Sequence, residues 1–105
     1  MNIQPVVITN IAREEVKKIL VKKKISSEFA LRIDVKGTGA SCGNTEFTIG
    51  FDSKKDTDLE YSNNGIKILV DKKKVLYLIG QKLDYHIEKD AQGFFFEKVN
   101  ENSGD

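Results

Sequence analysis

Two runs of alternating apolar and polar residues enclose one glycine-rich segment, and this arrangement constrains the fold more than any other feature of the sequence. Apolar side chains occupy every second position of residues 29–35 and again of residues 47–51. A period of two predicts β-strands with one buried face. The segment between them, residues 36–44, is too long for a two-residue turn, so the sequence predicts a hairpin with a long connection.

An amphipathic helix is predicted ahead of this hairpin. A short lead-in strand is expected over residues 3–8, and Pro5 confines it to a sheet edge or to the start of a strand. Thr9 or Asn10 then caps the helix, because a short polar side chain there accepts a hydrogen bond from the first turn. The helix is expected to run to about Lys24, with one apolar stripe packed on a sheet.

The remainder of the sequence favours strands, with one short helical insert. Asp71 caps a predicted helix over residues 72–79, and Gly80 ends it. Further strands are predicted at residues 59–61, 66–70, 83–88 and 94–96, the last of them well buried. This order excludes a doubly wound α/β sheet, which needs regular alternation of strands and helices. We therefore expect a mainly β protein with one amphipathic N-terminal helix and a short second helix.

The composition limits the number of domains and the class of partner. A chain of 105 residues fits one domain, expected over residues 1–100, and the polar residues 101–105 are expected to form a disordered tail. Seventeen Lys and Arg against sixteen Asp and Glu argue against a nucleic-acid binder. No apolar run has the length of a signal peptide or of a transmembrane helix, so no membrane association is expected. One cysteine without a disulfide partner indicates a reducing, cytoplasmic setting.

The only cysteine, Cys42, lies in the glycine-rich segment and is the candidate ligand for a soft metal. Nucleophilic catalysis would need a base beside it, and the spacing does not support a pair with the only histidine, His86. One thiol and one imidazole exclude a zinc finger, which takes about four such ligands. An iron–sulfur cluster also takes about four ligands, so a second chain or another molecule must complete the set. The residues alone leave an ordinary loop thiol, a metal ligand and a catalytic thiolate open.

Several blocks of the sequence, in order, resemble the HesB/IscA-type iron–sulfur proteins, also called A-type carriers. The resemblance extends over about residues 6–100. It is carried by four blocks: Leu31–Gly43 with the following Phe47 and Phe51-Asp52, Asn64–Asp71, Gly80–Tyr85 and Gly93–Phe96. The resemblance implies a compact, largely β domain, a HesB-like mixed β barrel or sandwich with a helix packed outside.

The cysteines differ from the pattern of that family. Its carriers have one cysteine in the glycine-rich segment and two more in a C-terminal C-x-C. Cys42 matches the first, in a slightly longer segment, but Phe96 is followed by Glu-Lys-Val-Asn-Glu-Asn-Ser-Gly-Asp without a C-x-C. The sequence therefore resembles a diverged member.

The resemblance implies a non-enzymatic protein of iron–sulfur cluster assembly or carriage, with no catalytic residue. Cys42 is the expected ligand of iron or of an iron–sulfur cluster, in a homodimer or together with a partner. The partners implied are iron–sulfur assembly proteins or apo-protein acceptors, and neither nucleic acid nor a membrane. The alternative is a HesB-like core domain without cluster binding that acts as a protein-interaction or structural module.

Overall fold

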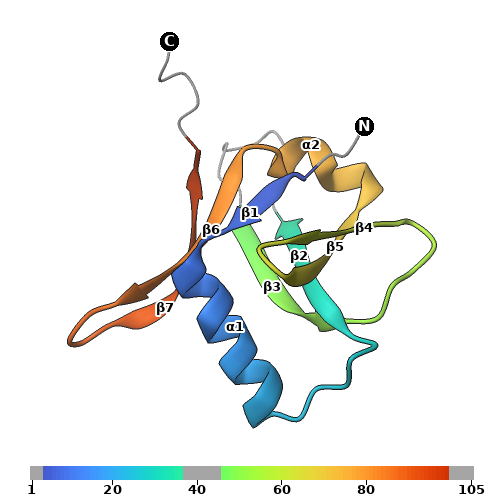
Figure 1. Ribbon diagram of the computed structural model, residues 1–105. Helices are drawn as coiled ribbons and strands as arrows, with labels where there is room; N and C mark the ends of the chain where they lie inside the picture. The colour runs from blue at the N-terminus through green and yellow to red at the C-terminus, as the bar shows by residue number, and fades with distance from the viewer. Residues whose placement is uncertain (1–3, 37–45, 100–105) are drawn as a thin grey trace.

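The computed structural model describes residues 4–36 and 46–99 of the chain (Figure 1). The predicted tail, residues 101–105, lies outside this part. The elements in chain order are β1 (Val6–Ile8), α1 (Asn10–Lys22), β2 (Ala30–Lys36), β3 (Glu46–Asp52), β4 (Asp58–Asn63), β5 (Ile66–Asp71), the 3-10 helix η1 (Lys72–Lys74), α2 (Val75–Leu78), β6 (Gln81–Ile87) and β7 (Gln92–Lys98). The expectation of a mainly β protein with an N-terminal helix and a short second helix is confirmed.

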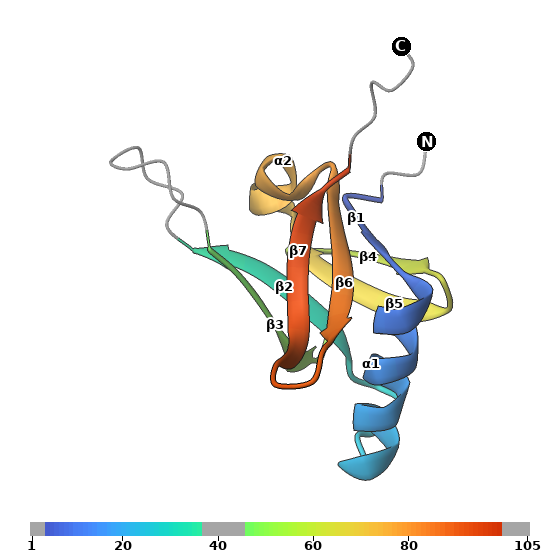
Figure 2. The ribbon, with the colours of Figure 1, turned by 90° about the vertical axis from the view of Figure 1, so that its left-hand side faces the viewer.

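The strands form two mixed sheets. A three-stranded sheet has the order β1-β6-β7, and a four-stranded sheet has the order β3-β2-β5-β4. Each contains one parallel pair, β1 with β6 and β2 with β5, while the other neighbours are antiparallel. Figure 2 shows the three-stranded sheet lying across the four-stranded one, with α1 at one end.

The core lies between the two sheets and α1. Strand β2 contributes Leu31, Ile33 and Val35, each 1% exposed, as the alternation of the sequence predicts. The other buried apolar residues of this cluster come from β1, α1, β5, α2 and β6: Val6, Ile8, Ala12, Val16, Ile66, Ile68, Val70, Leu78 and Leu83. On the other face of β5, Leu69 is also 1% exposed, whereas Lys67 on that face is exposed.

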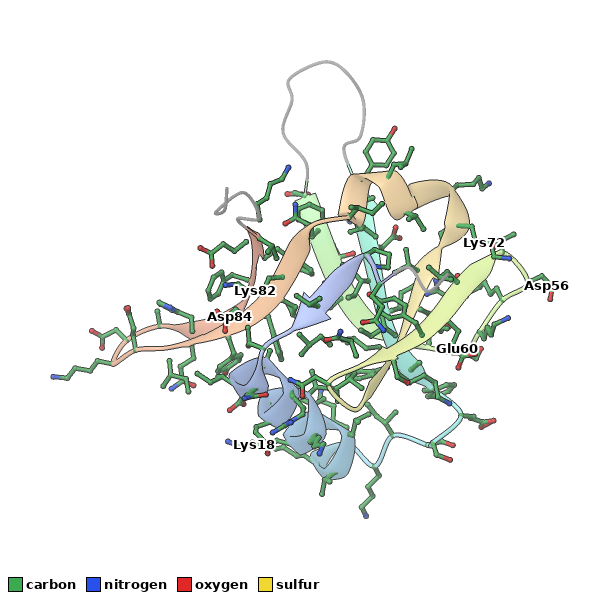
Figure 3. The ribbon with its side chains drawn as sticks, turned by 45° about the horizontal axis from the view of Figure 1, so that its top comes forward. Lys18, Asp56, Glu60, Lys72, Lys82 and Asp84 are labelled. Atoms are coloured by element: carbon green, nitrogen blue, oxygen red, sulfur yellow. The ribbon has the colours of Figure 1, made fainter. Side chains whose placement is uncertain are left out.

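Thr9 is the cap of α1. Its hydroxyl accepts a hydrogen bond from the backbone N–H of Ala12 at 3.2 Å and donates one to Asp84 at 2.8 Å. The same side chain therefore caps the helix and attaches its start to β6, where Figure 3 labels Asp84. The helix ends at Lys22, two residues earlier than predicted, and Lys24 adopts a positive φ of 52°. No helix in the described part of the chain is long and apolar enough to cross a membrane.

Side chains of β4 and of the turn after it cover the free edge of β1. The Tyr61 hydroxyl accepts a hydrogen bond from the Val6 N–H at 3.0 Å and donates one to the Val6 carbonyl at 2.7 Å. Asn63 accepts from the Ile8 N–H at 2.9 Å, and Asn64 donates to the Ile8 carbonyl at 2.9 Å. These bonds satisfy the edge that a neighbouring strand would otherwise occupy, and they join the two sheets.

Three local predictions need correction. The final strand is not well buried. In the described part of the chain, β7 lies at the edge of its sheet with β6 as its one neighbouring strand, and Phe95 is 38% exposed. The lead-in strand is shorter than predicted and begins at Val6. The helix after Asp71 is divided into η1 and α2, although the Asp71 side chain does accept from the Lys73 N–H at 2.9 Å, as a cap should.

Candidate functional site

The strands that flank the Cys42 segment form one antiparallel hairpin. Their register runs from Ala30 opposite Asp52 to Lys36 opposite Glu46, so the two strand ends next to the segment are direct partners. The predicted hairpin is confirmed by this pairing. Cys42 itself lies outside the described residues, and its role as a ligand of metal or cluster remains a prediction.

The end of the hairpin nearest Cys42 is held by contacts from two other elements. Lys74 of η1 donates to the Asp34 carboxylate at 2.8 Å and to the Val35 carbonyl at 3.3 Å. The hydrogen bond from Lys74 does most to lower the pKa of the Asp34 carboxyl below its ordinary value. On β3, the ring of Phe47 packs against that of Phe96 with centroids 4.9 Å apart. This end of the hairpin is therefore held by η1 and by the three-stranded sheet.

The other end of the hairpin is anchored by Arg32. Its guanidinium donates to both carboxylate oxygens of Asp58, and its Nε donates to Asp52 at 3.0 Å. The hydrogen bonds from Arg32 do most to lower the pKa of Asp58 below its ordinary value. The pKa of Asp52 is lowered to about 2, mainly by its hydrogen bond with Lys55 and also by Arg32. Both carboxylates are therefore charged at neutral pH, and they are engaged with cations.

Asp58 is the buried charged residue that the sequence did not reveal. It is 3% exposed, and it also accepts the Lys55 backbone N–H at 2.8 Å. In a sequence with 31% charged residues, a carboxylate two positions from Asp56 is not distinctive. Its burial becomes evident only from the fold, in which the Arg32 side chain reaches Asp58 at the start of β4. Its satisfied hydrogen bonds make it a structural group rather than a free acid or base.

The neighbours of His86 are defined, and they lie on the β6–β7 hairpin. Its ring meets Phe95 edge to face at 6.0 Å, and its Nε2 lies 3.4 Å from the Glu88 carboxylate. Both contacts come from residues close to it on the same hairpin. That Cys42 and His86 do not pair stays a prediction, because Cys42 lies outside the described part of the chain.

Within residues 4–36 and 46–99, no group of three or more His, Cys, Asp or Glu side chains is placed to hold a metal ion. The acidic residues around Arg32 are paired with cations, which removes them as ready ligands. The described residues therefore present no assembled metal site, and Cys42 lies outside them.

The two-sheet fold is that of structurally known iron–sulfur assembly proteins. The crystal structure of Escherichia coli SufA, described as involved in biosynthesis of iron–sulfur clusters, matches with a TM-score of 0.72 at 22% identity, over 93% of this chain and 83% of that one. The crystal structure of IscA with a 2Fe-2S cluster matches with a TM-score of 0.71 at 24% identity, over 89% and 84%. These likenesses define the class of fold and confirm its expected HesB-like character.

The sequence comparisons assign the family. The chain matches the family described as iron-sulphur cluster biosynthesis over residues 4–104. The iron-sulfur cluster insertion protein ErpA of Francisella tularensis subsp. novicida (strain U112) is 29% identical over 103 residues, which cover 97% of this chain and 84% of that protein. The chain belongs to the iron-sulphur cluster biosynthesis family. Proteins of this family are cluster carriers rather than enzymes, as the resemblance implied.

Proposed function

We propose that this protein binds iron or an iron–sulfur cluster through Cys42 and passes it to apo-protein acceptors in the cytoplasm. The observation that carries the proposal is the family match over residues 4–104, which includes the glycine-rich segment with Cys42. A relative named as a cluster insertion protein and a similar fold that contains a 2Fe-2S cluster support the same function. The acting unit is a single domain, residues 1–100.

The chemistry of the thiol explains why another molecule must take part. A thiolate is a soft ligand that suits iron–sulfur clusters, and a cluster takes about four ligands. One chain supplies one thiolate. The remaining ligands come from a second copy, an assembly partner, an acceptor or a free thiol. A ligand set shared between molecules also suits a carrier, because exchanging one ligand donor for another moves the cluster.

Anaerobic reconstitution tests ligation directly. The purified protein is incubated with iron and sulfide, desalted, and compared with Cys42→Ser and with the control His86→Ala. We expect visible absorbance and labile sulfide in the wild type and in His86→Ala, and neither in Cys42→Ser. Equal colour in all three proteins, or none in any of them, contradicts the proposal.

A second candidate function is a protein-interaction or structural module that binds no cluster. The presence of only one cysteine in the sequence favours it, since the family pattern described above has three. The same experiment separates the two candidates. A colourless wild type that nevertheless forms a stable complex with an assembly protein supports the module and rejects ligation by Cys42.

A further inference from the structure

The outer side of α2 and the residue that follows it bear three exposed apolar side chains. Leu76 is 83% exposed, and Tyr77 and Ile79 are each 48% exposed. The inner side differs, because Leu78 is 0% exposed and Val75 packs against the core cluster. The three exposed side chains therefore contribute little to the core. Single exposed apolar residues are common on proteins, whereas a contiguous group of them marks an interaction site.

Two lysines border this apolar group. Lys72 and Lys73 of η1 are exposed, and η1 continues directly into α2. They therefore precede Leu76 and Tyr77 by four residues, about one helical turn. In the part of the chain that the structure describes, neither lysine forms a salt bridge. We refer to Lys72, Lys73, Leu76, Tyr77 and Ile79 together as the α2 surface.

Two carboxylates beside η1 are already engaged within the fold. Asp71 accepts the backbone N–H of Lys73 at 2.9 Å, and Asp34 accepts from the Nζ of Lys74 at 2.8 Å. Neither forms a salt bridge with the side chains of Lys72, which Figure 3 labels, or Lys73. A partner that covers the apolar centre of the α2 surface is therefore complementary when it brings acidic groups to the border.

The α2 surface lies beside the end of the hairpin that leads to the Cys42 segment. Lys74, which directly follows the two bordering lysines, donates to the Val35 carbonyl at 3.3 Å. Val35 is one residue from the end of β2. Figure 1 shows α2 at this same end of β2. A protein docked on the α2 surface is therefore held close to the hairpin end that bears the candidate ligand.

We propose that the α2 surface is the docking site for an acidic apo-protein acceptor. An apolar side chain of the acceptor packs on Leu76 and Tyr77, and acceptor carboxylates face Lys72 and Lys73. The apolar contact supplies most of the affinity, while the lysines attract and orient the acceptor. This inference rests on the proposed carrier function, in which an acceptor must approach Cys42. Docking and ligation use different residues, so each can be tested without the other.

Binding to the metal-free Cys42→Ser protein tests docking in the absence of ligation. The probe is an apo-ferredoxin of strongly negative net charge, labelled with a fluorophore at its N-terminus and titrated at low ionic strength. We expect saturable binding that Leu76→Ser weakens about tenfold, as truncation at the centre of an interface does. Val21→Ser, which changes a similarly exposed apolar residue on α1, should leave the affinity unchanged.

Charge reversal tests the border of the α2 surface. Lys72→Glu combined with Lys73→Glu should weaken binding about tenfold or more. The matched control is Lys22→Glu combined with Lys23→Glu, which changes the net charge equally at the exposed end of α1 and should have a much smaller effect. Absence of binding to the Cys42→Ser protein, or equal losses in the α1 and α2 variants, overturns docking at the α2 surface.

Cluster transfer separates a failure of docking from a failure of ligation. Reconstituted Leu76→Ser protein should hold as much labile sulfide as the wild type, but its transfer should reach half its maximal rate at an about tenfold higher apo-ferredoxin concentration. A coloured wild type whose transfer is unchanged by Leu76→Ser contradicts the docking site alone. A colourless wild type, together with binding to Cys42→Ser that depends on Leu76, supports the docking site and contradicts ligation alone.

Discussion

Arg32 and Asp58 form a two-point contact, in which the two terminal nitrogens of the guanidinium donate to the two carboxylate oxygens at 2.7 and 2.6 Å. Their side chains are 16% and 2% exposed. The contact joins β2 to the start of β4 across the end of β5, and Asp52 on β3 is bound by the same guanidinium. One side chain thus links both strands of the hairpin that flanks the Cys42 segment to the start of β4.

Removal of this cation should destabilise the fold strongly. Arg32→Met leaves the Asp58 carboxylate buried without its main partner, and the loss of one member of a buried pair typically costs about 3–5 kcal/mol. Denaturant unfolding measures the change in the free energy of unfolding. The double variant Arg32→Met with Asp58→Leu should lose less than Arg32→Met alone. A double variant that loses as much as the two single variants together would show that no unpaired charge is involved.

Asp58 should make stability depend on pH in the acidic range. Because its pKa is lower in the folded protein than the ordinary value of 3.8, ionised Asp58 stabilises the fold above that value. This contribution is lost as the pH falls through the lower, folded pKa. Asp58→Asn should therefore show a smaller decrease in unfolding free energy below about pH 4.

The control for this titration is Asp56→Asn, which changes an exposed carboxylate two residues away. It should keep the acid dependence of the wild type. If the free energy of unfolding falls equally steeply with decreasing pH in Asp58→Asn and in the wild type, other groups cause the acid dependence.

Tyr61 should affect stability both at neutral and at alkaline pH. Tyr61→Phe removes both hydrogen bonds to Val6, which is 0% exposed, and unsatisfied buried groups cost about 1–3 kcal/mol. Burial raises the pKa of Tyr61 to about 12 from an ordinary value of 10.0. Its contribution is therefore complete below pH 10.0 and is lost as the pH rises through about 12. Unfolding free energies measured over this range should fall less in Tyr61→Phe, while Tyr77→Phe, exposed on α2, should behave as the wild type.

The cap of α1 gives a prediction with a conservative control. Thr9→Val keeps the shape of the side chain but removes the hydroxyl that serves both Ala12 and Asp84. We expect a loss of about 1 kcal/mol or somewhat more, since a cap alone contributes about that amount. Thr9→Ser, which keeps the hydroxyl, should retain most of the stability in the same denaturant measurement. Equal losses in the two variants would assign the effect to the methyl group instead.

Local patterns in the sequence were sufficient to predict most of the elements and the burial of β2, but not the exposure of β7. The alternation around Leu31 and Ile33 predicted β2 and its hairpin with β3 because both depend on neighbours in the sequence. Phe94, Phe95 and Phe96 suggested burial, but the position of β7 at an edge is set by the order of the whole sheet. The strand order depends on contacts between segments that are distant in the sequence, and local periodicity cannot predict such contacts.

The candidate site shows the same limit. The glycine-rich segment identified Cys42 as the residue to test, because its composition is distinctive. Asp58 was not distinguished from other carboxylates, since its burial comes from a partner 26 residues earlier in the sequence. The hydrogen bonds of Tyr61 to β1 span 55 residues and were equally invisible.

Cluster delivery is the most direct test of the carrier function. The reconstituted protein is freed of unbound iron and sulfide and is mixed anaerobically with an apo-ferredoxin in the presence of a chelator that removes free iron. We predict that the ferredoxin gains its cluster spectrum from the wild-type protein and not from Cys42→Ser treated in the same way. A ferredoxin that remains without a cluster after incubation with the loaded wild type, or that gains it equally from Cys42→Ser, would contradict the account.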